Sequence, residues 1–461
     1  MLKFPSFFRF EDIFMVPLCI LVIYSIAYGA RRKYDKTEIK RYFFPALFIR
    51  LAIVIIYAAL IQFYYSGQGD TSIYYQAILD MHKAVSNDFS FMGDIFLHLK
   101  IDQAGRLFPY FVYDDLGGYT QYIISDPRNF IVPRFGFIFS LLFFKSYLCA
   151  SLFISFFAFA GCWRLFKVFY YLYPHLHKKA AIAALYLPSV IFWGVGLVKD
   201  SICMGSLGFL FYALFNIFFR KRKIGASIII SFLSGFLLYN IKPYIFLCFI
   251  GAFVLWLFLH FNKQIRDRTL RSVASFLFLI AGGITTYFLI QTFTSSETAT
   301  SFSAENIFDA VAIQQKGFSS NAASGGDFKM VRFDNTVTGF LLMFPQGVIT
   351  SLFRPFPWEV KNPLMLLSAL EALGFFILTV MCFRTIGFFK TFRMIFSERT
   401  TLMCFVYSIL FAGLIGITTF NFGSLVRYKI PCLPFYIMML FVIMDKSGKF
   451  SPNIIFSKKY F

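Results

Sequence analysis

Charged residues are scarce in this sequence. Only 15% of its 461 residues are Asp, Glu, Lys or Arg, whereas 58% are hydrophobic and 68 are Phe. A typical soluble domain has roughly 25% charged residues. So few polar residues cannot cover the apolar surface of a soluble core. The composition also excludes a disordered chain and a small disulfide-rich secreted domain, which leaves a membrane protein.

The common nucleotide, hydrolase and metal motifs are also missing. The sequence has no Walker A loop, GxGxxG, GxSxG or CxxC. An ATP-driven pump, a Rossmann enzyme and a serine hydrolase of the usual kind are therefore unsupported. The eight cysteines lie in or beside apolar runs, which favours small buried core residues over a disulfide framework.

Long apolar runs recur along the chain. Their length, about 16–22 residues, is that of a helix crossing the hydrocarbon core, whereas a barrel would show short alternating segments. We therefore predict an all-α polytopic bundle, a single transmembrane domain over 1–461, with about 11 to 13 spans; Lys145 interrupts one apolar region and leaves the count open. The spans are placed near 11–30, 43–63, 131–162, 180–198, 201–219, 224–240, 243–260, 272–292, 364–383, 400–420 and 430–444.

The net charge of +21 is unevenly distributed. Basic residues cluster in short segments between spans, which are 31–41, 164–179, 220–223, 263–271, 384–399 and 446–459. The positive-inside rule explains this pattern without a nucleic-acid partner and places these segments in the cytoplasm. Two longer segments, 64–130 and 293–363, are then outer loops, and the first has eight Asp but four Lys or Arg. We expect a multi-pass protein of the bacterial cytoplasmic (inner) membrane.

The first outer loop offers a candidate general base. Asp70 follows an aromatic stretch and two glycines, Gly67 and Gly69, directly after the second span. A carboxylate partly desolvated at the membrane surface gains basicity and could deprotonate an acceptor. The alternative, which is compatible with this role, is that Asp70 caps a helix beginning at Thr71.

Two further outer turns carry charges beside spans. Lys199 and Asp200 follow a glycine-containing junction between two apolar runs, and Lys242 precedes Pro243. Ionisable residues this close to a span are costly and are usually functional. Lys199 could hold a phosphate while Asp200 caps the next span; alternatively Lys199 is a snorkelling residue of a plain hairpin. Lys242 could contact a lipid phosphate or anchor its turn.

The last candidates lie late in the chain. Arg354 and Glu359 lie in a segment broken by prolines and anchored by Trp358, so they are either phosphate and hydroxyl ligands or part of an interfacial segment. Arg427 lies between the last two spans, on the outer side where basic residues are depleted. Arginine binds phosphate oxygens through two N–H groups. An anionic membrane-embedded substrate, such as a polyprenyl phosphate, would explain these outer cations.

Two of these features resemble the GT-C superfamily of polytopic glycosyltransferases, of the protein mannosyltransferase and aminoarabinose transferase type. They are Gly69-Asp70 in the first large outer loop and Arg427-Tyr428-Lys429-Ile430-Pro431 before the last span. The resemblance implies that Asp70 is the catalytic base and that Arg427 holds the phosphate of a polyprenyl-linked sugar donor. The chain departs from the family in having Gly69 where a second acid is common.

The sequence therefore predicts an inverting glycosyltransferase of cell-envelope polysaccharide biosynthesis. It would transfer sugar from a polyprenyl-phosphate donor to a glycan, lipid or protein acceptor, with no cofactor. Lys199, Arg427 and Arg354 would neutralise the departing phosphate. A divalent metal on the Asp-rich loop has no supporting ligand spacing. The alternatives are an O-antigen polymerase or ligase, a lipid-linked glycan flippase or transporter, and a non-catalytic scaffold of an export complex.

Overall fold

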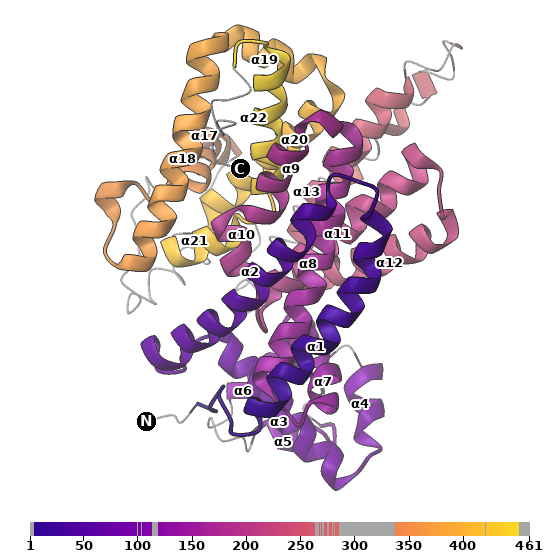
Figure 1. Cartoon of the computed structure of the whole chain (residues 1–461), viewed down its shortest axis with the longest axis vertical. Coiled ribbons are helices and arrows are strands. Elements are labelled where there is room, and N and C mark those ends of the chain that lie inside the picture. Colours follow the sequence, from indigo (N-terminus) through magenta and orange to yellow (C-terminus); the bar gives the residue numbers. More distant parts are fainter. Residues whose placement is uncertain are drawn as a thin grey trace. The chain divides into compact units, whose positions relative to one another are not determined.

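The computed structural model describes residues 4–98, 100–102, 104–112, 119–262, parts of 267–284, 337–419 and 421–450. Helices are the only regular elements among these residues, as the sequence predicted (Figure 1). Eight are long and apolar enough to cross a membrane, and a bent helix pair makes a ninth if it is one span. The chain is therefore a multi-pass membrane protein.

The described residues form two compact units. Unit 1 comprises Met1–His177 and Ala184–Lys242, and unit 2 comprises Lys178–Ala183 and Pro243–Phe461. The long helices of unit 1 are α1 (Asp12–Arg31), α2 (Lys40–Ala59), α8 (Tyr147–Leu172), α11 (Lys199–Phe215) and α12 (Ile224–Ile241). Short π-helical turns, η2 (Leu60–Tyr64) and η5 (Asn216–Arg220), extend α2 and α11.

The helices of unit 1 alternate in direction. Cys19 near the start of α1 contacts the backbone of Cys149 at the start of α8, whereas Phe43 at the start of α2 packs on Trp163 in the second half of α8. The basic segments 31–41, 164–179 and 220–223 therefore lie at one end of these helices, and segment 64–130 follows the other end of α2. The positive-inside rule assigns the first of these ends to the cytoplasm.

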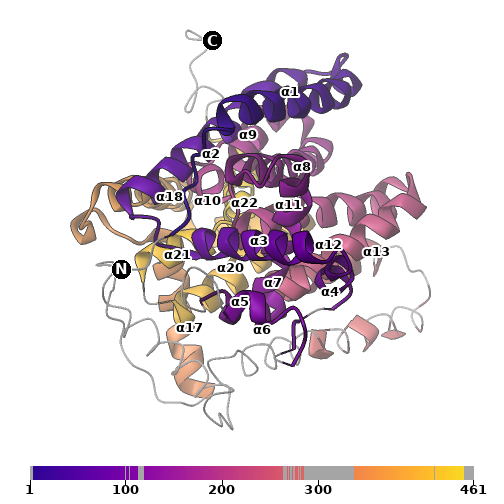
Figure 2. The same cartoon turned by 90° about the horizontal axis from the view of Figure 1, so that it is seen from below.

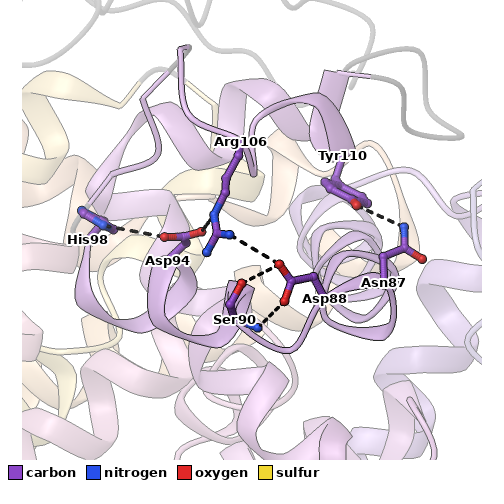
Figure 3. A network of polar contacts seen from close by, with 7 residues as sticks. All are labelled: Asn87, Asp88, Ser90, Asp94, His98, Arg106 and Tyr110. Carbon is purple, nitrogen blue, oxygen red and sulfur yellow. Dashed lines mark hydrogen bonds and ion pairs between the residues drawn. The ribbon is translucent and has the colours of Figure 1, made fainter.

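The first outer loop is an ordered helical layer. It contains α3 (Asp70–Asn87), α4 (Phe91–Leu97), α5 (Pro109–Val112), α6 (Tyr119–Ser125) and α7 (Pro127–Leu142). Figures 1 and 2 show these helices together at one end of unit 1. Arg106 joins the layer at the surface, since it pairs with both Asp88 and Asp94 (Figure 3).

Two predicted spans differ in the structure. Region 131–162 is not one span, because α7 ends at Leu142 and α8 begins at Tyr147; the backbone between them turns through positive φ at Phe144 and Lys145. α7 packs against α3 and is not among the eight candidate spans. One crossing by α8 therefore satisfies the parity that the charge pattern requires.

Region 180–198 is a broken helix rather than a continuous span. It consists of α9 (His177–Ala181), η4 (Ile182–Tyr186) and α10 (Pro188–Trp193), followed by an irregular stretch to α11. Pro188 lacks a backbone donor, and Gly196 has φ +80°, so neither continues a helix. The predicted span 272–292 lies mostly outside the described residues. Among the described residues there are therefore eight or nine candidate spans, where the sequence predicted 11 to 13 for the whole chain.

Unit 2 is built mainly from α13, α17, α18, α20 and a bent pair. The bounds are α13 (Pro243–Phe261), α17 (Val337–Phe353), α18 (Pro363–Ile386), α19 (Phe388–Ser397), α20 (Arg399–Thr418), α21 (Phe422–Tyr428) and α22 (Leu433–Lys446). α21 and α22 are bent by 64°. Residues 293–336 of the second outer loop lie outside the described residues, and its later part forms α17.

Glycines allow a close contact between two helices in each unit. In unit 1, Gly161 of α8 lies against Gly205 and Gly208 of α11; in unit 2, Gly347 of α17 lies against Gly413 and Gly416 of α20. Lipid tails provide no hydrophobic force between spans, so close backbone packing of small residues drives their association. All eight cysteines are buried, and none of them forms a disulfide.

Candidate functional site

Asp70 lies in the first turn of α3. α2 ends in a π-helical turn, and Gly67 and Gly69, with φ +76° and +138°, reverse the chain before α3 begins. Gly69 is the N-cap and Asp70 lies in the first turn of α3, so Asp70 does not hold the N-cap position predicted for it. The Asp70 side chain is exposed. The protein therefore presents this carboxylate at its surface and does not bury it.

Hydrogen bonds hold α3 in place behind Asp70. Thr71 Oγ1 lies 2.9 Å from the hydroxyl of Tyr147, and the Tyr75 hydroxyl donates to the backbone oxygen of Lys145 at 2.9 Å. Further along the helix, His82 Nε2 lies 2.8 Å from Ser140 Oγ of α7. Burial, together with the charge of Lys145, lowers the pKa of His82 to about 4, so this ring is neutral near pH 7. Asp70, the candidate general base, therefore lies on a helix that several hydrogen bonds hold in position.

A cavity of about 520 Å³ lies beside α3. Three cations line it, namely Arg9, Lys83 and Lys145, and no Asp or Glu is among its lining residues. Asp70 does not line it. Sequence reasoning missed this site, although Lys145 was visible as a charge interrupting an apolar region. The cavity can accept an anion at the outer end of unit 1.

Asp200 and Lys242 form a buried ion pair. Lys242 Nζ lies 2.5 Å from Asp200 Oδ1, and the pair joins the first turn of α11 to the end of α12. Val198 is the N-cap of α11 and Asp200 lies in its first turn, so Asp200 does not hold the N-cap position predicted for it. The Lys242 ammonium group pairs with Asp200 and not with a lipid phosphate, which was one of the two roles predicted for it. Lys199, the neighbour of Asp200, is half-buried.

Replacing Asp200 with Asn is expected to destabilise the protein. The change leaves the buried ammonium of Lys242 without its counter-ion, and breaking a buried pair from one side costs about 3–5 kcal/mol. A lower thermal unfolding temperature in detergent would show this. The double variant Asp200→Asn/Lys242→Gln should recover part of the loss, because it removes both charges. Equal unfolding temperatures for Asp200→Asn and wild type would contradict the assignment.

Arg354 and Glu359 are paired in unit 2. Arg354 Nε lies 3.0 Å and 3.1 Å from the two carboxylate oxygens of Glu359, and Nη2 also donates to Oε1. Glu359 accepts from the Phe356 N–H at 2.8 Å. Burial alone would raise the pKa of Glu359, but the hydrogen bonds from Arg354 and Phe356 outweigh it, so this pKa lies below its usual value. The pair fixes the proline-rich turn before α18.

Lys429 adds a buried cation next to this turn. Its Nζ donates to the backbone oxygen of Arg354 at 3.2 Å, and only 1% of the residue is exposed. The carboxylate of Glu371 on α18 interacts electrostatically with the Lys429 ammonium group. Arg427, two residues earlier and at the end of α21, is half-buried. The bend between α21 and α22 therefore carries two cations at different depths.

Some of the candidate site residues contact one another, and others belong to different units. Within unit 1 it pairs Asp200 with Lys242, and within unit 2 it groups Arg354, Glu359 and Lys429. Asp70 and Lys199 belong to unit 1, and Arg427 belongs to unit 2.

Sequence reasoning also missed two buried arginines of unit 1. Arg50, in the middle of α2, donates to the backbone oxygen of Gly194 at 2.9 Å and to Cys162 Sγ at 3.4 Å. Arg134 of α7 lies over the Phe130 ring, and its Nε and Nη2 have no hydrogen-bond partner among the described residues. Arg50 could have been found as an ionisable residue inside an apolar span. Arg134 could not, because α7 is hidden within a longer apolar region.

Asp88 and Asp94 of the first outer loop are engaged in local contacts. Asp88 accepts from the side chain and backbone N–H of Ser90, and these bonds, with the charge of Arg106, hold its pKa below the usual value (Figure 3). Asp94 pairs with Arg106 at 2.7 Å. No cluster of three or more His, Cys, Asp or Glu able to hold a metal ion occurs in the described part of the chain.

Comparisons with known proteins do not assign a family or a function to the chain. No family model, curated protein or solved structure matches the chain. Its function must therefore be argued from the residues described above.

Proposed function

We propose that the protein is an inverting membrane glycosyltransferase that takes sugar from a polyprenyl-phosphate donor on the outer side of the bacterial cytoplasmic membrane. The observation that carries this proposal is the exposed Asp70 at the start of α3. It follows the outer end of a membrane span, and α3 is held by hydrogen bonds to Tyr147 and Lys145. A fixed, accessible carboxylate at this place suits a general base.

The proposed reaction uses charges at the outer ends of the spans. Asp70 takes the proton of the acceptor hydroxyl or amine while the acceptor atom attacks the anomeric carbon. The bond between that carbon and the phosphate oxygen breaks, and the lipid phosphate leaves as an anion. Arg427 and Lys199 stabilise its charge. Because Arg354 is paired with Glu359 and Lys242 with Asp200, these two cations have positioning roles in the proposal.

A second candidate is a polysaccharide polymerase or ligase. The cavity lined by Arg9, Lys83 and Lys145 favours it, because its lining combines three cations with no carboxylate. Such an enzyme would bind a lipid diphosphate there and would not need Asp70. A flippase has less support, because the mid-span cation Arg50 is held inside the packing by Gly194 and Cys162.

Arg427→Lys tests the phosphate contact in the proposed reaction. Lysine keeps the charge but loses the two-pronged contact, so we expect KM for the donor to rise about tenfold while kcat falls less. The measurement is transfer of labelled sugar from a polyprenyl-phosphate donor by protein reconstituted in liposomes. Arg384→Lys, in the last turn of α18, is the matched control and should leave both constants unchanged. If wild-type protein transfers no sugar from any such donor, the proposal is overturned.

A further inference from the structure

Cations from several basic segments of unit 1 line one cavity at the end opposite Asp70. The cavity has a volume of about 750 Å³, within the usual range of small-molecule sites. Its lining residues come mainly from the ends of α1, α8, α11 and α12. Six cations line it, and no Asp or Glu is among its lining residues. These cations are Lys33, Arg164, Lys167, Arg220, Arg222 and Lys223.

Neutral groups, not carboxylates, hold the deeper cations. Lys167 is 8% exposed, and its Nζ donates to the Tyr212 hydroxyl at 2.8 Å. Arg220 Nη1 reaches the same hydroxyl at 3.4 Å, and its guanidinium lies 4.0 Å from the centre of the Tyr171 ring. Arg164 donates to the Ala160 oxygen and lies over the Phe209 ring. These contacts orient the charges without neutralising them.

Topology alone does not account for this arrangement. The positive-inside rule requires cations in loops near span ends, where water solvates them. It does not require a lysine to be buried against tyrosines, and a buried cation without a counter-ion is costly. Three separate basic segments, around 33, 164–167 and 220–223, contribute to one lining. An anion in the cavity would offset the cost that these charges carry.

The rest of the lining identifies the class of anion. Three arginines can each fork onto phosphate oxygens. Aromatic side chains, among them Tyr34, Trp163 and Phe159, supply an apolar wall beside them. The cavity thus combines a polyanion site with a surface for hydrocarbon. Basic pockets between spans on the cytoplasmic side are suited to anionic lipid head groups.

We propose that this cavity binds a phosphate monoester or diphosphate group, carried either by a membrane lipid or by a soluble molecule. The site lies at the opposite end of the unit 1 helices from Asp70, and it does not depend on the proposed glycosyltransferase reaction.

The test measures stabilisation of delipidated full-length protein in detergent. The probes are dioctanoyl phosphatidic acid, inorganic pyrophosphate and, as the uncharged control, dioctanoyl glycerol. We expect phosphatidic acid to raise the thermal unfolding temperature of wild type and dioctanoyl glycerol to leave it unchanged. Stabilisation by pyrophosphate as well, or by pyrophosphate alone, also supports the site and assigns it to a soluble phosphate. No stabilisation by either phosphate probe overturns the proposal.

Variants localise the effect. Arg220→Gln should weaken binding at least tenfold. The double variant Arg222→Gln/Lys223→Gln, at two exposed lining positions, should do so without disturbing the packing. Arg32→Gln removes a charge from the same basic segment as Lys33 but outside the lining, so it is the matched control. Equal weakening by Arg32→Gln and the double variant would reveal a general charge effect and overturn the proposal.

Discussion

Asp70→Asn is expected to lower sugar transfer by about 100- to 10,000-fold, which is the usual contribution of a general base. Stability should change little, because Gly69, not Asp70, is the N-cap of α3 and the side chain is exposed. The variant loses the attraction between a first-turn carboxylate and the helix dipole, worth about 0.3–1 kcal/mol. Transfer rate and unfolding temperature, measured on the same preparation, separate the two roles.

The control for this experiment is Asp102→Asn. Asp102 is an exposed acid of the same outer loop, so its removal changes the local net charge equally. Activity should persist in this variant. Full activity in purified Asp70→Asn protein would remove Asp70 from the mechanism and would favour the polymerase-like function at the Arg9, Lys83 and Lys145 cavity.

Gly416→Ala is expected to prevent correct packing of unit 2. A methyl group on Gly416 would lie 1.9 Å from the backbone oxygen of Gly347, so α17 and α20 must separate. Backbone atoms cannot move aside as a flexible side chain can, so the contact between the two helices is lost. We expect a large loss of folded, monodisperse protein in detergent, measured by size-exclusion chromatography and thermal unfolding.

Gly374→Ala provides the contrast in the same unit. This glycine lies within α18, and a methyl group there would meet no atom within 4 Å. Alanine favours a helix over glycine by about 1 kcal/mol, so this variant should be as stable as wild type or more stable. Similar behaviour of the two variants would show that the Gly347–Gly416 contact does not hold α17 and α20 together.

Hydropathy predicted the spans that are formed by one continuous helix. Region 201–219 corresponds to α11 with its π-helical extension, and 364–383 corresponds to α18. It could not separate α7 from α8, because α7 is rich in Phe and apolar enough to resemble part of a span. Nor could it show that 180–198 is broken, since Pro188 and Gly196 change the backbone without lowering the hydropathy.

The candidate sites show a similar limit. Sequence position identified Asp200 and Lys242 as unusual, but their pairing depends on how α11 and α12 pack, and they are 42 residues apart. The basic runs were explained by topology because their separation along the chain hides the cavity that they form. The sequence thus shows the sign of each charge and its position along the chain. Which residue each charge pairs with can be seen only in the folded structure.

Arg50 has a consequence for how the protein is made. The second span is strongly apolar and can enter the membrane on that basis despite its arginine. Yet the groups that accept hydrogen bonds from Arg50, Cys162 and Gly194, lie 112 and 144 residues later in the chain. An arginine at the centre of a span costs about 2.5–3.5 kcal/mol in insertion experiments. During synthesis the ribosome must therefore complete α8 and α10 before Arg50 can donate its hydrogen bonds to Cys162 and Gly194. Until then, α2 holds an arginine whose hydrogen-bond acceptors in the folded protein have not yet been synthesised.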